Sequence, residues 1–182
     1  MNLAEKSLLP VLFDKWNRVA LLDAWLVAGA IAQTVWNHAA GFPLAHGIND
    51  IDIVYFDGND LSEDAEAEHA ARIRSAFSEL GLWIDVKNEA RVHLWYETKF
   101  GYPIIPYLST ADAIATFPTT ATAVGLRSNN GSLEFCAPFD LADLEGIVRP
   151  NKSQIREIYE QKVNRWIKMW PKLHVVPWVE EK

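Results

Sequence analysis

The chain has 182 residues, and 49% of them are hydrophobic, including eight Trp. This length and composition indicate one folded domain and exclude global disorder. A single cysteine, Cys136, excludes an internal disulfide framework and a cysteine-based zinc site. The net charge is −7, but residues 151–182 carry seven Lys/Arg against four Asp/Glu, so the acidic excess lies in residues 1–150. An acidic body argues against a protein that coats nucleic acid, which would present a basic face.

The start of the chain lacks the pattern of a signal peptide. Asn2, Glu5 and Lys6 interrupt the apolar residues there. The longest apolar stretch, residues 24–35, is shorter than the roughly 20 residues that a membrane span needs. We therefore expect a cytoplasmic protein without a membrane partner.

The first half of the chain predicts two helices followed by a strand–helix–strand unit. Hydrophobic spacing and helix-stop residues predict, in chain order, a helix within residues 8–22, a helix from Gly29 to Gly41, a strand over residues 50–56, a helix from Ser62 to Gly81 and a strand over residues 82–87. Strand, helix and strand within about forty residues fit a parallel βαβ unit, although an antiparallel return is an open alternative.

The second half predicts short helices, a hairpin and a longer final helix. The expected elements are a helix over residues 91–99, a short helix capped by Ser109 or Thr110, a hairpin turning at Asn130-Gly131, a short helix after Asp140, and a helix from an Asn151 cap to Pro171. We predict an α/β (α+β) fold with a short mixed sheet flanked by helices. Residues 1–150 would form the main domain, and residues 151–182 would form a helical tail packed on it.

Two carboxylates lie at the start of the first predicted strand. Asp50 and Asp52 are two residues apart, so both side chains project from one face while Ile51 and Ile53 project from the other. Two negative charges so close repel each other unless a cation lies between them. Oxygen ligands favour a hard ion, so we expect Mg²⁺ or Mn²⁺ at Asp50 and Asp52.

Two further features have a role in metal-assisted phosphoryl transfer. Gly29 and Ala30 begin a helix, and exposed amides at a helix start bind phosphate. Asp85 lies on the next predicted strand, where a third carboxylate would complete the metal shell and help to deprotonate an attacking hydroxyl.

These motifs resemble the nucleotidyltransferases of the DNA-polymerase-β type, which have a Gly-led helix start, then two carboxylates separated by one hydrophobic residue, then a later strand carboxylate. More narrowly, the chain resembles a bacterial nucleotidyltransferase-like family, formerly a domain of unknown function. The matching segments lie within residues 20–150 and are residues 28–31, 49–57, 85–93, 121–125 and 137–144.

The resemblance implies a polymerase-β palm-like fold and nucleotidyl transfer. It assigns Asp50, Asp52 and Asp85 to the catalytic metal site and the Gly29-Ala30 turn to phosphate. Asn88 and Arg91 follow the third carboxylate in a matching segment, and Arg91 would hold a triphosphate oxygen. For Arg91, a salt bridge that neutralises the acidic residues is the open alternative.

We therefore expect metal-dependent transfer of a nucleoside monophosphate from an NTP to an acceptor hydroxyl. A small molecule or a protein is favoured over nucleic acid as the acceptor, because no basic domain is evident. The alternative is an inactive nucleotide-binding or protein-interaction module with the same fold. Ala30, where the resembling proteins have Gly or Ser, and the long segment between residues 30 and 50 favour this alternative. The basic face of the final helix is expected to be solvated.

Overall fold

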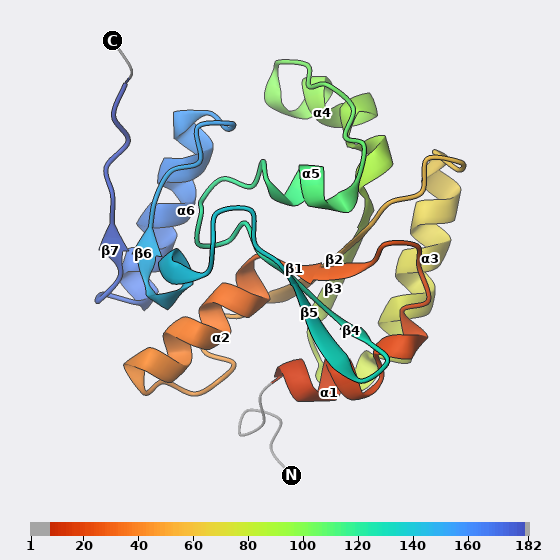
Figure 1. Cartoon of the computed structure of the whole chain (residues 1–182), viewed down its shortest axis with the longest axis horizontal. Helices are drawn as coiled ribbons and strands as arrows, with labels where there is room; N and C mark the ends of the chain where they lie inside the picture. The colour runs from red at the N-terminus through yellow and green to blue at the C-terminus, as the bar shows by residue number, and fades with distance from the viewer. Residues whose placement is uncertain (1–7, 181–182) are drawn as a thin grey trace.

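A mixed five-stranded sheet forms the centre of the computed structural model, which describes residues 8–180 (Figure 1). Its strand order is β3-β2-β1-β4-β5. The strands are β1 (Trp25–Val27), β2 (Asp50–Tyr55), β3 (Trp83–Asn88), β4 (Gly125–Asn129) and β5 (Ser132–Cys136), with a separate pair β6 (Ile147–Val148) and β7 (His174–Val175). This arrangement confirms the predicted fold class. Asn2, Glu5 and Lys6 lie outside the described residues.

Helices flank the sheet. The α-helices are α1 (Leu8–Asp14), α2 (Gly29–Ala40), α3 (Glu63–Ala76), α4 (Val92–Phe100), α5 (Thr110–Ile114) and α6 (Arg156–Met169). Short 3₁₀ turns are η2 (Trp16–Arg18), η3 (Ser78–Leu80), η4 (Glu89–Arg91) and η5 (Ala142–Glu145). Ser62 caps α3 by accepting a hydrogen bond from the Ala65 amide, and Ser109 caps α5 by accepting one from the Asp112 amide. Both caps agree with the sequence prediction. Among the described residues, no helix is long and apolar enough to cross a membrane.

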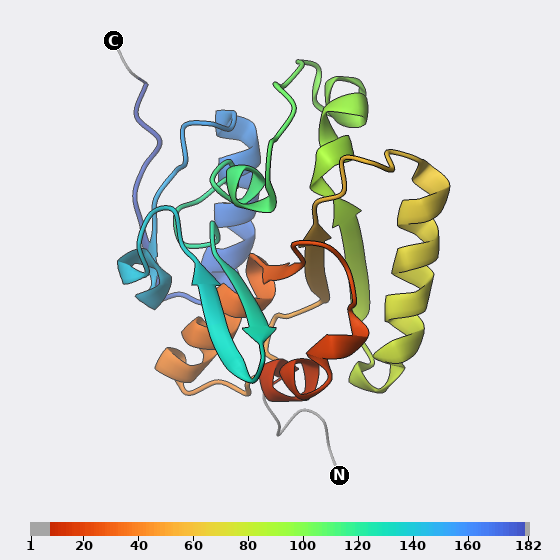
Figure 2. The same ribbon diagram turned by 45° about the vertical axis from the view of Figure 1, so that its right-hand side comes forward.

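The β2–α3–β3 unit is parallel, as one of the two sequence interpretations predicted. The register pairs Asp50 with Trp83, Asp52 with Asp85 and Val54 with Lys87. The antiparallel return is therefore wrong. Figure 2 shows the two strands side by side with α3 next to them.

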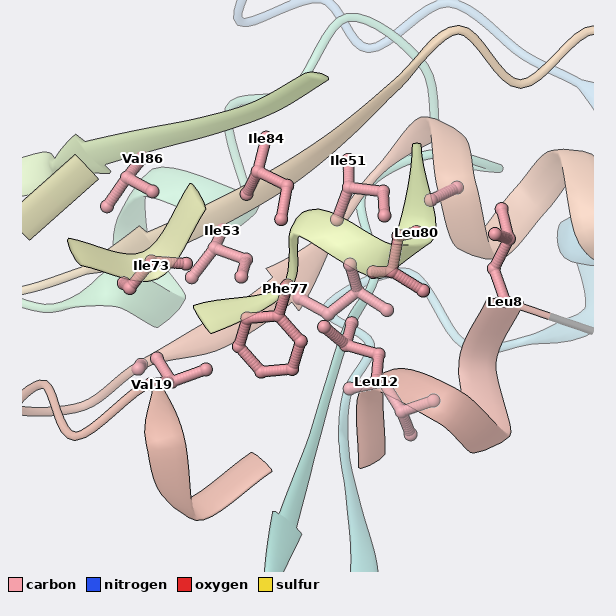
Figure 3. Packing of buried hydrophobic residues seen from close by; sticks show 14 of the residues in the cluster. Leu8, Leu12, Val19, Ile51, Ile53, Ile73, Phe77, Leu80, Ile84 and Val86 are labelled. Carbon is pink, nitrogen blue, oxygen red and sulfur yellow. The ribbon is translucent and has the colours of Figure 1, made fainter. Parts of the chain in front are cut away.

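The main core lies on one face of this sheet. Ile51 and Ile53 of β2 and Ile84 and Val86 of β3 project from it and are almost fully buried. They pack among apolar side chains of α1 and α3 and the turns next to them; those labelled in Figure 3 are Leu8, Leu12, Val19, Ile73, Phe77 and Leu80. Because strand residues alternate, burial of this set turns Asp50, Asp52 and Asp85 to the opposite face.

The final helix packs against α2 through aromatic side chains. Trp36 of α2 makes edge-to-face contacts with Trp166 and Trp170, with ring centroids 5.3 and 5.4 Å apart. The helix begins at Arg156, so the predicted cap at Asn151 is wrong. Instead, Asn151 Nδ2 donates to the Ala115 carbonyl at 2.7 Å, a long-range contact that no local signal encodes.

Candidate active site

The two strands bring the predicted carboxylates onto one face. Asp50 is exposed and Asp52 is partly buried, and Asp85 is the register partner of Asp52 on the neighbouring strand. The Asp85 side chain is 37% exposed and lies 3.7 Å from Lys87 Nζ. Strand alternation and parallel pairing therefore place the three carboxylates on one face of the sheet.

Asp52 is a partly buried carboxyl group with two other carboxylates near it. Burial, first, and the nearby Asp50 and Asp85 carboxylates, second, raise the pKa of Asp52 from 3.8 to about 6. Both causes disfavour the ionised form because the charge is removed from water and repelled by its neighbours. A cation that bound here would relieve both effects.

A cavity of about 290 Å³, which we call the Asp52 cavity, opens over Asp50 and Asp52. Asp50 and Asp52 form one wall, and the start of α2, with Gly29, forms another. Lys162 and Arg165 of α6 also line it. Two carboxylates, the glycine at the start of α2 and two basic residues from distant parts of the chain thus line one space.

The start of α2 has a strained backbone. Ala28, the N-cap, has φ 57° and ψ −122°, a conformation that residues with a side chain seldom adopt. Its carbonyl accepts hydrogen bonds from the Ile31 and Ala32 amides. The earlier amides, of Gly29 and Ala30, have no acceptor within the helix. A Cβ on Gly29 would come 3.1 Å from Gln33 Nε2, which leaves little room for a side chain there.

Ala30 contributes only backbone to this turn. Its side chain is 2% exposed and packs in the main core, and it does not line the Asp52 cavity. Lack of a hydroxyl at this position therefore removes no group that faces the cavity.

Asn88 and Arg91 lie away from the Asp52 cavity. Asn88 is buried, and its Nδ2 donates to the carbonyls of Asp57 and Asp60 at 2.9 and 3.1 Å. Arg91 is also buried and forms an ion pair with Glu66 at 2.8 Å, which is the alternative that the sequence left open. Both side chains thus hold the segment after β2 against the segment after β3, and neither lines the cavity.

Lys162 and Arg165 are the functional candidates that the sequence analysis missed. Their spacing in the sequence predicts a solvent-exposed face of α6. Only the packing of α6 on α2 brings them to the cavity that contains Asp52. Partial removal from water lowers the pKa of Lys162, while the Asp52 carboxylate acts in the opposite direction. Lys162 Nζ also lies 5.9 Å from the ring centroid of Trp166.

A second cavity, of about 300 Å³, adjoins the first and contains Asp85. We call it the aromatic cavity, because its wall includes Trp95, Tyr96, Phe100, Tyr107 and Phe117. Asp85 lines this space and not the Asp52 cavity. The residues common to both cavities are Lys87, Glu89, Phe117, Pro118 and Lys162.

The carboxylates of Asp50 and Asp52 suit a metal ion that also takes ligands from a substrate. Within residues 8–180, no three His, Cys, Asp or Glu side chains lie close enough together to hold a metal ion by themselves. Mg²⁺ is commonly bound through one or two carboxylates together with substrate phosphates, so Asp50 and Asp52 are sufficient for this mode.

Comparison with known proteins gives a consistent picture. A family model described as nucleotidyltransferase matches residues 14–175. A solved NMR structure, described as revealing a CCA-adding enzyme head domain, is similar with a TM-score of 0.75 and 25% sequence identity. The similarity covers 93% of this chain and 89% of that one. A search of curated proteins found no match. With its sheet, its paired aspartates and a family match over most of its length, the chain belongs to the nucleotidyltransferase family.

Proposed function

We propose that the protein transfers a nucleoside monophosphate from an NTP to an acceptor hydroxyl, with Mg²⁺ or Mn²⁺ as the metal. One observation carries this proposal: Asp50, Asp52, the start of α2, Lys162 and Arg165 line the same cavity. Anionic phosphates are attracted to helix-start amides and to Lys and Arg, whereas carboxylates repel them unless a cation intervenes.

Asp50 and Asp52 would hold the metal through their carboxylate oxygens. When bound, the ion would supply positive charge that offsets the repulsion between these carboxylates and the phosphates. The neighbouring groups of this chain act on the other phosphate oxygens. The amides of Gly29 and Ala30 donate to them, and Lys162 and Arg165 neutralise their charge.

Asp85 would accept the proton of the acceptor. In the transfer, the hydroxyl oxygen attacks the α-phosphorus and a new O–P bond forms. The bond from the α-phosphorus to the bridging oxygen breaks, and pyrophosphate leaves with its electron pair. The acceptor proton passes to the Asp85 carboxylate and then to water. Because Asp85 lies on the strand next to Asp52, donor and acceptor would approach from neighbouring cavities.

A labelling experiment tests the activity. Each of the four NTPs, labelled at the α-phosphate, is incubated with the protein, Mg²⁺ or Mn²⁺, and separate small-molecule, protein and RNA fractions of a cell extract. We expect a labelled product and pyrophosphate with the wild type, and neither with Asp52→Asn. Asp64→Asn, an exposed change at the start of α3 outside both cavities, is the matched control and should behave as the wild type. Full activity in Asp52→Asn would refute the assignment.

The inactive module is the second candidate. It is favoured by the ammonium of Lys87, 3.7 Å from Asp85, which neutralises part of the charge on the third carboxylate. This candidate predicts metal-dependent NTP binding, and no pyrophosphate release with the small-molecule, the protein or the RNA fraction. An NTP is thus the proposed ligand of both candidates, and the proposed compartment of both is the cytoplasm.

A further inference from the structure

The aromatic cavity has a wall whose polar groups are already paired. Tyr96 Oη donates to Gln154 Oε1 at 2.9 Å and lies 3.0 Å from Tyr102 Oη. Gln154 Nε2 in turn donates to the Thr116 carbonyl at 2.8 Å. Tyr107 Oη and Thr116 Oγ1 are 2.7 Å apart. These uncharged polar groups therefore offer little hydrogen bonding to a ligand, so the aromatic rings are the main contact surface of this wall. The charged side chains that line the rest of the cavity are Asp85, Lys87, Glu89, Lys99 and Lys162.

The rings at this wall form a continuous aromatic group. Trp95 and Tyr96 are stacked with centroids 6.1 Å apart, and Tyr96 and Phe100 are 4.5 Å apart. Lys99 Nζ lies 5.3 Å from the ring centroids of both Trp95 and Phe100. A flat aromatic ligand gains stacking energy on such a surface whatever its polar edge, because every nucleobase has a π face.

We propose that the aromatic cavity binds the acceptor, and that the acceptor is a small molecule in which a planar heteroaromatic ring carries a hydroxylated group, as in a nucleoside. This inference rests on the proposed function, because it takes the second substrate to be a hydroxyl acceptor. Asp85 lines this cavity, so a hydroxyl on a ligand stacked here lies on the side of the third carboxylate.

The two cavities meet at Lys87, Glu89 and Lys162, which gives the hydroxyl a path toward a phosphate bound in the Asp52 cavity. Since the uncharged polar groups of this wall are occupied by one another, we expect the base to be held mainly by stacking on the aromatic rings. The cavity is therefore expected to bind purine and pyrimidine nucleosides with similar affinities.

Calorimetric titration with adenosine and with uridine tests this proposal, because neither ligand carries a phosphate. We expect both to bind the wild type without metal, and Trp95→Ala to weaken both by about tenfold. Trp83→Ala is the matched control. Trp83 is 59% exposed and lines neither cavity, so its removal should leave nucleoside affinity unchanged.

NMR of the wild type keeps the test valid if Trp95→Ala does not fold. The indole N–H signal of Trp95, assigned by its loss in Trp95→Phe, should shift on addition of adenosine while that of Trp83 stays in place. Failure of both nucleosides to bind, or a binding shift that spares Trp95, would overturn the proposal.

NTP titrations separate this proposal from the proposed function. Trp95→Ala should bind Mg²⁺ and NTP as the wild type does, and Asp52→Asn should retain adenosine binding. If Trp95→Ala weakens NTP binding as well as nucleoside binding, the cavity holds the donor base and the acceptor assignment is wrong. If Asp52→Asn binds Mg²⁺ and NTP normally, the proposed function fails while the nucleoside result stands by itself.

Discussion

Glu89 is a buried carboxyl where the two cavities meet. It is 7% exposed, and burial, followed by repulsion from Glu66 and Asp52, raises its pKa from 4.5 to about 8. Between these two values the folded protein holds a proton that the unfolded chain releases. The free energy of unfolding therefore falls as the pH rises through this window, at up to about 1.4 kcal/mol per pH unit.

Glu89→Gln should remove this dependence. The amide has nearly the same shape and no charge, so the variant should lose less stability than the wild type between about pH 6.5 and pH 8. Asp52 contributes with the same sign only up to its own pKa of about 6, which is why the range begins above it. Thermal melting of the two proteins, with the exposed Glu97→Gln as the control, measures the difference. If the melting temperatures of the wild type and Glu89→Gln fall equally with pH, Glu89 is ionised in the folded protein.

At the scale of elements, local signals predicted most helices and the β2–α3–β3 unit. Ser62 and Ser109 are strong N-caps, and Asn130-Gly131 is a hairpin turn, so the chain around them needs no distant partner to adopt its shape. Strand β1 was not predicted, because its three residues are all buried and show no alternation. The isolated pair β6–β7 is two residues long on each strand and depends on packing of the tail.

The start of α2 yields a stability prediction. Ala28→Gly should raise the free energy of unfolding by about 1 kcal/mol, because glycine adopts φ 57°, ψ −122° without the steric cost that alanine meets. Ala32→Gly, a regular position in the same helix, should lower it by about 1 kcal/mol or more. Urea denaturation compares the two. Destabilisation of both variants to a similar extent would mean that the turn at Ala28 is unstrained.

Helix α6 yields a binding prediction. Lys162→Gln should weaken Mg²⁺-dependent NTP binding by about tenfold, the usual effect of losing one charge-assisted contact to phosphate. Lys168→Gln, an exposed change on the same helix outside both cavities, should have no effect. Calorimetry at one salt concentration measures both. Equal affinity in the two variants would remove Lys162 from the phosphate site.

At the scale of the whole molecule, the uneven charge of the sequence has a structural counterpart. Residues 1–150 carry the acidic excess and the tail carries the basic one. Packing of Trp166 and Trp170 on Trp36 brings Lys162 and Arg165 of this tail to the Asp52 cavity. Composition revealed both charges, but their meeting depends on contacts between residues more than a hundred positions apart. The placement of Asp50 and Asp52 on one face was predictable because strand alternation is a local rule. The pairing of Asp52 with Asp85 depends on the parallel register, which the sequence left open.

The most direct test of the central claim is a calorimetric titration of the four NTPs with and without Mg²⁺, on the wild type, Asp52→Asn and the control Asp64→Asn. We predict that at least one NTP binds the wild type and the control more tightly with Mg²⁺ than without it. In Asp52→Asn this gain should be lost, because the carboxylate that shares the ion with the phosphates is gone. An affinity that does not depend on the metal, or a metal dependence that survives in Asp52→Asn, would contradict a metal-dependent nucleotide site at Asp50 and Asp52.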